Sequence, residues 1–178
     1  METKQDIRHR IREIINSTRA QMLDSLSDSV CLKILNRVKS EGKDRMTILL
    51  YWSLPDEVRT PQLIDSLHKM GHRILLPVVN GDTLLLREYR NISDMTVGQF
   101  EIQEPIGGEF TDYDKIDLAF IPGRAFTTDG ARLGRGKGYY DRLLTKIGCP
   151  LIGVCFPFQI VEKIPMDTHD IMMNEVIY

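Results

Sequence analysis

The chain has 178 residues, a length typical of one domain that can bury a sizeable core. Apolar residues make up 42% and charged residues 27% of the chain, which argues against a disordered, collagen-like or coiled-coil protein. The net charge of −2 favours neither nucleic acid nor an acidic membrane as a partner, so any anion-binding site must be local.

The sequence has no apolar stretch that would serve as a signal peptide or a membrane span, since charged residues recur from the start of the chain. We therefore expect a cytoplasmic protein, and we expect it to be a monomer. The three cysteines, Cys31, Cys149 and Cys155, form no CxxC pair. They predict buried free thiols, and neither a disulfide framework nor a zinc site.

The N-terminal region predicts two amphipathic helices. The first carries apolar residues at helical spacing, at Ile7, Ile11, Ile14, Ile15 and Met22. The second is expected to begin with Ser27 as its cap, ahead of the apolar positions Val30, Ile34, Leu35 and Val38. Each helix would bury one stripe against the core.

A strand and a helix are expected next along the chain. The apolar run at 46–52, MTILLYW, is typical of a buried strand. Thr60 as the cap and Pro61 at the first helical position predict the start of a helix, and Gly71 predicts its end.

Two further apolar runs, at 73–79 and 83–89, predict a β-hairpin because Gly81 and Asp82 supply a turn between them. Residues 91–114 follow with little periodicity and with several glycine and proline residues. We interpret this segment as a long functional loop.

The C-terminal part alternates strands with a helix. The run at 116–122, IDLAFIP, is the clearest central strand, a helix is expected from about Tyr139 to Ile147, and 151–156 predicts another strand. This alternation predicts a single-domain α/β fold with a mostly parallel sheet and flanking helices. Such sheets bind ligands at the carboxyl ends of their strands.

The run at 132–141, RLGRGKGYYD, lies between the central strand and the helix that follows it. Its three alternating glycines let backbone amides approach phosphate oxygens closely, near a helix N-terminus that favours anions. Arg132, Arg135 and Lys137 add positive charge. The pattern therefore predicts a phosphate-binding loop.

Glycine spacing alone leaves a second interpretation open, in which the same run is a flexible turn with solvated cations. The run is not a Walker A loop, because Gly138 follows Lys137 where that motif needs Ser or Thr. In addition, Ala131 stands where that motif needs its upstream glycine. The run does not match a dinucleotide-binding fingerprint either.

RLGRGKGYYD and the preceding IPGRAF resemble the central motif of the 5-formyltetrahydrofolate cyclo-ligases, also called methenyltetrahydrofolate synthetases. The resemblance covers nearly the whole chain, through KQDIR at 4–8, LPDEVRT at 54–60, IQEP at 102–105 and HD at 169–170. It implies a Rossmann-like layered architecture of the NagB/RpiA/CoA transferase-like kind. It also implies ATP- and Mg²⁺-dependent cyclisation of 5-formyltetrahydrofolate to 5,10-methenyltetrahydrofolate, with ADP and phosphate released and a phosphorylated formyl (imidate) intermediate.

The resemblance implies ATP contacts for Lys4 and Arg8, which lie one helical turn apart. Spacing alone favours a solvated face, and Arg12 and Arg19 keep that interpretation. The resemblance also implies nucleotide contacts along the loop, at Arg132, Leu133, Gly134, Arg135, Gly136, Lys137, Gly138, Tyr139 and Tyr140. Of these, Arg132, Lys137 and Tyr140 are the expected catalytic residues, acting through positioning and charge compensation.

Asp141 and Asp170 are the Mg²⁺ ligands that the resemblance implies, since this ion prefers oxygen ligands and keeps several waters. The alternatives are a helix-capping residue for Asp141 and a surface turn residue for Asp170. Two positions depart from the family pattern. Arg124 stands where many relatives carry an apolar residue, and Asn174 stands where an acid is common.

Trp52, Glu57, Phe100 and Tyr140 resemble the folate-contacting positions of the family. Flat rings stack on the pterin or benzoyl group, and a carboxylate accepts hydrogen bonds from the pterin. Without the resemblance, Trp52 and Phe100 would be core residues and Glu57 a solvated acid. Two other functions then stay open: a noncatalytic nucleotide- or RNA-binding module, and another phosphate-substrate enzyme, such as a sugar-phosphate isomerase.

Overall fold

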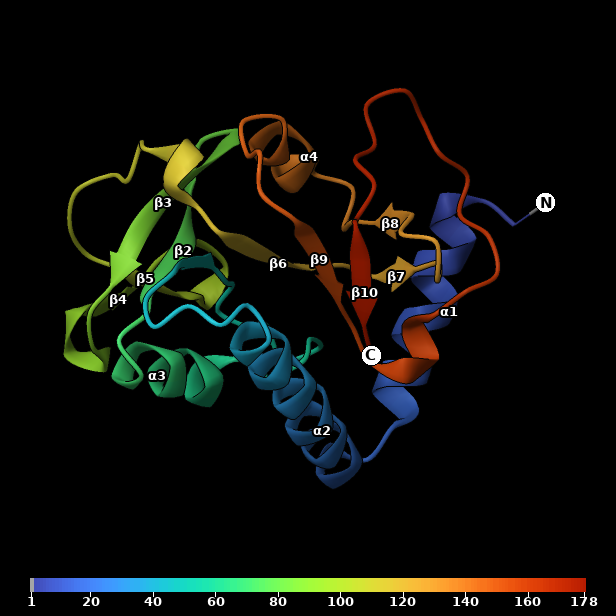
Figure 1. Cartoon of the computed structure of the whole chain (residues 1–178). Coiled ribbons are helices and arrows are strands. Elements are labelled where there is room, and N and C mark those ends of the chain that lie inside the picture. The colour runs from blue at the N-terminus through green and yellow to red at the C-terminus, as the bar shows by residue number, and fades with distance from the viewer. Residues whose placement is uncertain (1) are drawn as a thin grey trace.

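The chain folds around a six-stranded sheet (Figure 1). The computed structural model describes residues 2–178, apart from the side chain of Phe100. The strands of the sheet are β1 (Thr47–Leu49), β2 (Arg73–Asn80), β3 (Thr83–Tyr89), β6 (Leu118–Pro122), β9 (Leu151–Val154) and β10 (Glu175–Ile177). Their order is β10-β9-β6-β1-β2-β3, and only β3 runs antiparallel to its neighbour. This confirms the predicted α/β fold with a mostly parallel sheet.

Helices cover both faces of the sheet. Buried residues of α1 (Lys4–Ser17), α2 (Ala20–Lys39) and α3 (Pro61–Lys69) belong to one core cluster, and those of α4 (Tyr139–Leu144) belong to a second. Figure 1 shows α2 and α3 on one side of the sheet and α4 on the other. Strand residues alternate between the two clusters, as in β2, where Ile74 and Leu76 face the first and Leu75 faces the second.

The predicted boundary between the first two helices is wrong. α1 ends at Ser17 and α2 begins at Ala20, so Met22 belongs to the second helix, where it is 55% exposed. Ser27 lies inside α2, and its hydroxyl accepts a hydrogen bond from the backbone N–H of Arg59 at 3.1 Å. Apolar residues continue at helical spacing across the break between α1 and α2, so the sequence pattern does not indicate it.

The start of α3 is confirmed at Pro61, but Thr60 does not cap it with its side chain. The Thr60 hydroxyl instead donates to the carbonyl of Tyr51 at 2.5 Å and accepts from the N–H of Ser53 at 3.1 Å. These bonds fix the loop that follows β1 against the beginning of α3. The β2–β3 hairpin is formed as predicted.

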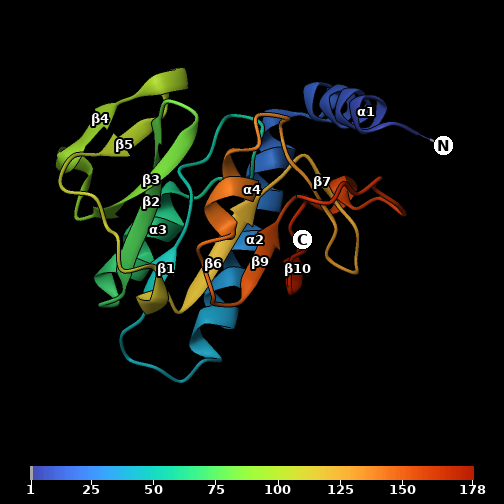
Figure 2. The same cartoon turned by 90° about the horizontal axis from the view of Figure 1, so that it is seen from above.

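Residues 91–114 are more ordered than a long loop. They contain β4 (Met95–Val97) paired with β5 (Gln103–Pro105), and the 3₁₀ turns η1 (Ile92–Asp94), η2 (Gln99–Glu101) and η3 (Tyr113–Lys115). Figure 2 shows β4 and β5 beside the β2–β3 hairpin. Strands of three residues are too short to show periodicity in a sequence.

A second small ribbon, β7 (Ala125–Phe126) with β8 (Arg132–Leu133), and the 3₁₀ turn η4 (Pro157–Gln159) complete the fold. The three cysteines are free, and only Cys155 is fully buried. Among the described residues, none of the helices combines the length and the apolar character needed to cross a membrane.

Candidate functional site

A cavity of about 420 Å³ opens at the carboxyl ends of β1, β2 and β6, where a parallel sheet is expected to bind its ligand. Segments far apart in the sequence line it: Tyr51, Trp52, Leu54 and Glu57 after β1, Pro77, Val79 and Leu84 of the hairpin, Ile102 and Glu104 near β5, Pro122 and Gly123 at the end of β6, and Arg132, Gly134, Arg135, Lys137, Gly138, Tyr139, Tyr140 and Asp141. The predicted phosphate loop thus shares one cavity with residues expected to face folate.

Glycine is required at two positions of the loop. Gly136 has φ 97° and Gly138 has φ 68°, a left-handed conformation in which a side chain would be strained. Gly138 directly precedes α4, which has six residues and ends at Leu144, before the predicted Ile147. A helix this short adds less dipole to an anion site than the sequence suggested.

Arg132 is fixed in the wall of the cavity. Its side chain is 3% exposed, and its Nη2 lies 2.6 Å from Oδ1 of Asp141. Its Nη1 donates to the carbonyl of Pro122 at 3.2 Å, and its guanidinium lies 5.6 Å from the ring centre of Tyr140. Burial, together with the charge of Glu57, raises the pKa of Tyr140, so the phenol stays protonated at neutral pH.

Lys137 differs from Arg132 because its side chain is exposed. Its backbone carbonyl accepts a hydrogen bond from Nη2 of Arg142 at 2.9 Å. The Nε of the same arginine donates to the carbonyl of Asp82 in the β2–β3 turn at 2.9 Å. The backbone of the loop is therefore held in place, while the ammonium group has no partner among the described residues.

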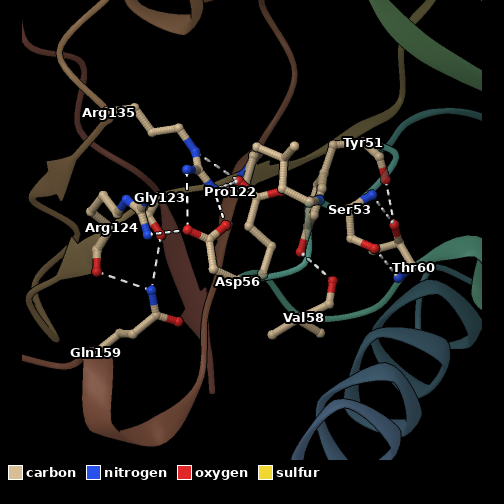
Figure 3. A network of polar contacts seen from close by, with 12 residues as sticks. Tyr51, Ser53, Asp56, Val58, Thr60, Pro122, Gly123, Arg124, Arg135 and Gln159 are labelled. Carbon is tan, nitrogen blue, oxygen red and sulfur yellow. Dashed lines mark hydrogen bonds and ion pairs between the residues drawn. The ribbon is translucent and has the colours of Figure 1, made fainter. Parts of the chain in front are cut away.

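Asp56 lies between two arginines (Figure 3). Its Oδ2 is 2.5 Å from Nη1 of Arg124, and its Oδ1 is 2.5 Å from Nη2 of Arg135. Arg135 also pairs with Oε1 of Glu57 at 2.8 Å. Gln159 holds the turn that carries Arg124 by donating to its carbonyl at 2.9 Å. Arg124 is thus a buried ion-pair partner and not an exposed cation.

The pKa values in this network follow from burial and charge. Burial works against ionisation of Asp56, but the hydrogen bonds and charges of Arg135 and Arg124 outweigh it and hold the pKa of Asp56 below its usual value. Burial lowers the pKa of Arg124, and the nearby charge of Arg135 acts in the same direction. Asp56 therefore keeps the positive charges of Arg124 and Arg135 together beside the cavity, which Arg135 lines.

Replacing Asp56 with Asn is expected to lower the free energy of unfolding by about 2–3 kcal/mol, because Arg124 would keep a buried charge without a partner. Arg124→Met should cost only about 1 kcal/mol, since Asp56 retains Arg135 and some water. Urea unfolding of both variants measures the difference. Equal losses would contradict the role given to Asp56.

α1 brings one of its two expected nucleotide contacts to the loop. The Nε of Arg8 donates to the carbonyl of Gly134 at 2.8 Å. Lys4 lies instead against a turn near the C-terminus, with Nζ 2.6 Å from Asp167 and 2.5 Å from Asp170. Neither basic residue lines the cavity itself.

The two aspartates expected to bind Mg²⁺ have different surroundings. Asp141 lines the cavity and is 25% exposed, and only its Oδ1 is engaged by a described residue. Asp170 does not line the cavity. Burial works against its ionisation, but hydrogen bonds from Asp167 and Lys4 and the charge of Arg132 hold its pKa below the usual value.

The donor set fits a magnesium ion that is held mainly by a ligand. Within residues 2–178, no three His, Cys, Asp or Glu side chains gather as a metal cage. Mg²⁺ commonly uses only one or two carboxylates together with phosphate oxygens and water. Asp141 suits that arrangement better than Asp170, because Asp141 lines the cavity with one oxygen free and Asp170 does not line it.

Three of the residues expected to face folate, Trp52, Glu57 and Tyr140, line the cavity. Trp52 also packs against the core. Part of its side chain therefore faces the cavity and another part faces the core. The expected folate contact of Phe100 falls on a side chain that the structure does not describe.

Sequence reasoning missed three residues of the site. Asp56 and Glu104 stand inside motifs that were recognised, LPDEVRT and IQEP, yet neither was given a role. Arg142 follows the glycine run directly, and nothing in its local pattern indicates that it would reach the β2–β3 turn.

Comparison with known proteins identifies the family. A profile of the 5-formyltetrahydrofolate cyclo-ligase family matches residues 1–178. The chain is 32% identical to the 5-formyltetrahydrofolate cyclo-ligase of Haemophilus influenzae, over 98% of this chain and 96% of that protein. It is 29% identical to a probable 5-formyltetrahydrofolate cyclo-ligase of Schizosaccharomyces pombe, over 96% and 94% of the two chains.

Solved structures agree with these matches. The 5,10-methenyltetrahydrofolate synthetase of Aquifex aeolicus superimposes with a TM-score of 0.84 at 30% identity, covering 98% of this chain and 88% of that one. The synthetase of Mycoplasma pneumoniae shares the fold, with a TM-score of 0.79 at 24% identity over 98% and 97% of the two chains. The chain therefore belongs to the 5-formyltetrahydrofolate cyclo-ligase family, a family of ATP-dependent ligases in folate one-carbon metabolism.

Proposed function

We propose that the protein binds 5-formyltetrahydrofolate and the terminal phosphates of ATP in this one cavity and forms 5,10-methenyltetrahydrofolate, ADP and phosphate. The observation that supports the proposal is the composition of the cavity wall. A glycine run with mobile and fixed cations makes one part of it, and aromatic and apolar side chains make the rest.

The nucleotide would lie along the glycine run. Gly136 and Gly138 leave the backbone bare, Arg132 supplies a fixed positive charge, and Lys137 supplies a mobile one. Arg8 braces the run through Gly134. Arg135 is held by acidic partners and is therefore less available to a phosphate group than the other two cations.

Folate would lie against the remaining walls. Trp52 and Tyr140 offer ring surfaces, and Pro77, Val79 and Leu84 add apolar side chains to the lining of the cavity. Glu57 contributes to the same wall while it holds Arg135.

The reaction begins when the formyl oxygen attacks the terminal phosphorus of ATP and ADP departs. The resulting phosphorylated imidate carries an electrophilic formyl carbon, which N10 of the folate attacks. Phosphate then leaves with the original formyl oxygen, N10 loses its proton, and the five-membered ring is closed. Arg132 and Lys137 would compensate the charge that moves onto the transferred phosphoryl oxygens, and the neutral Tyr140 hydroxyl would donate a hydrogen bond.

A magnesium ion, held by Asp141 together with the ATP phosphates, would neutralise phosphate charge when bound. Apart from the ion, the chain's own contribution is to align the formyl oxygen with the phosphoryl group. Such alignment of two bound substrates supplies much of the rate in phosphoryl transfer.

A single assay tests the function. Purified protein with 5-formyltetrahydrofolate and Mg-ATP should develop the near-ultraviolet absorbance of the methenyl product, and omission of ATP should abolish it. ADP should form in equal amount. Folded protein that shows neither signal would refute the proposal.

A further inference from the structure

Glu104 is a buried acid that the mechanism above does not use. It lies on β5, it is 7% exposed, and it lines the cavity. Its Oε1 accepts a hydrogen bond from the backbone N–H of Val79 at 3.2 Å, and no ion pair to it occurs among the described residues. A buried carboxylate without a cation or further donors is costly to maintain.

Two features of the fold accommodate the Glu104 carboxylate, a free N–H on β2 and a glycine at position 98. β1 pairs with β2 only as far as Leu75, so β2 continues past that point without a neighbour on that side and Val79 has an N–H to offer. Gly98 makes room for the carboxylate, because a Cβ there would lie 2.0 Å from Oε2 of Glu104. The backbone of Gly98 has φ −95°, which any residue adopts, so the acid and not the chain conformation explains the glycine.

The other acids of the cavity already have partners. Glu57 accepts a hydrogen bond from the N–H of Leu54 at 2.9 Å and pairs with Arg135. Asp141 pairs with Arg132. Within the described part of the chain, Glu104 is therefore the lining carboxylate that has no cation as a partner, and it accepts one hydrogen bond.

We propose that Glu104 recognises the aminopyrimidinone edge of the reduced folate, accepting hydrogen bonds from ring N3–H and from the 2-amino group. This rests on the function proposed above. Two carboxylate oxygens match two parallel N–H donors, as they do with a guanidinium. The nearby side chains of Pro77, Leu84 and Ile102 are apolar and suit the flat faces of the ring.

The same charge would orient the substrate. Glu104 repels the carboxylates of the glutamate tail and the phosphates of ATP, so the donor edge of the pterin is the part of either substrate that fits beside it. Glu57, whose oxygens accept from Leu54 and Arg135, also holds Arg135 in position.

The test compares Glu104→Met with the unmodified protein in equilibrium binding. Methionine keeps the length of the side chain and removes its acceptors. We expect 5-formyltetrahydrofolate to bind about 10- to 100-fold more weakly, because the lost hydrogen bonds involve a charged group. ATP binding should change by less than about twofold, since no phosphate contact is lost.

A folate analogue with a 2-methyl group in place of the 2-amino group separates recognition from structure. The penalty of Glu104→Met should be much smaller for this analogue, since one of the two donors is already absent. Equal penalties for both ligands, or no penalty for either, would overturn the proposal. Binding is read without turnover, so a protein that fails to make the methenyl product still reports on Glu104.

Gly98→Ala provides the second variant, needed if Glu104→Met does not fold. The new methyl group occupies the place of the carboxylate, so the same selective loss is expected. In a Glu104→Ala background the Gly98→Ala change should add no further loss, because the group it displaces is gone. A Gly98→Ala protein that binds both folates as tightly as the unmodified chain contradicts the assignment.

Discussion

Lys137→Ala is expected to lower the turnover of 5-formyltetrahydrofolate by about 10²- to 10³-fold, the usual effect of removing one group that stabilises charge in a transition state. Lys137 is the mobile cation of the glycine run, and its exposed side chain supports little of the core. The free energy of unfolding should therefore change by less than about 0.5 kcal/mol. Steady-state kinetics and urea unfolding of the same preparation measure both effects.

Lys115→Ala is the matched control. Lys115, in η3, is an exposed lysine that pairs with Asp112. It does not line the cavity. Its replacement should leave turnover and stability nearly unchanged. If Lys137→Ala turned over as fast as this control, the role of Lys137 would be wrong.

Asp141→Asn is expected to reduce both stability and turnover. Arg132, 3% exposed, would keep its charge in the wall of the cavity without the carboxylate 2.6 Å away. Breaking a buried ion pair from one side costs about 3–5 kcal/mol, and the partial exposure of Asp141 reduces the expected loss to about 2–3 kcal/mol. Turnover should fall as well, because Arg132 loses its fixed position and the proposed magnesium ligand is removed.

A double-mutant cycle distinguishes the ion pair from other effects of the substitution. Arg132→Met combined with Asp141→Asn should recover part of the lost stability, since no unpaired buried charge remains. Asp167→Asn serves as the surface control, because Asp167 is 75% exposed and Lys4 also pairs with Asp170. Additive losses in the double variant would show that the Arg132–Asp141 pair contributes nothing.

Local patterns predicted the parts of the fold that local interactions determine. Gly81 and Asp82 indicated the β2–β3 turn, and Pro61 indicated the start of α3. The short strands β7, β8 and β10 carry no readable period and were not predicted. The break between α1 and α2 was also missed, because apolar spacing continues across it.

Some residues of the site are likewise indicated by local sequence patterns, and others are not. The glycine run predicts phosphate binding from its own sequence, since spacing and charge are both local properties. Asp56 forms ion pairs with Arg124 and Arg135, which lie far from it in the sequence. No single segment of the sequence therefore indicates these pairs. The role proposed for Glu104 depends on Val79 and Gly98, which the sheet and the β4–β5 ribbon place next to it. Pairings of this kind become visible only in three dimensions.

The two hydrogen bonds of Arg142 connect the turn of the β2–β3 hairpin to the carbonyl of Lys137. The hairpin also supplies the apolar residues Val79 and Leu84 to the lining of the cavity. A displacement of the hairpin would therefore be transmitted to the backbone of the glycine run through Arg142, a single guanidinium outside the signature motif.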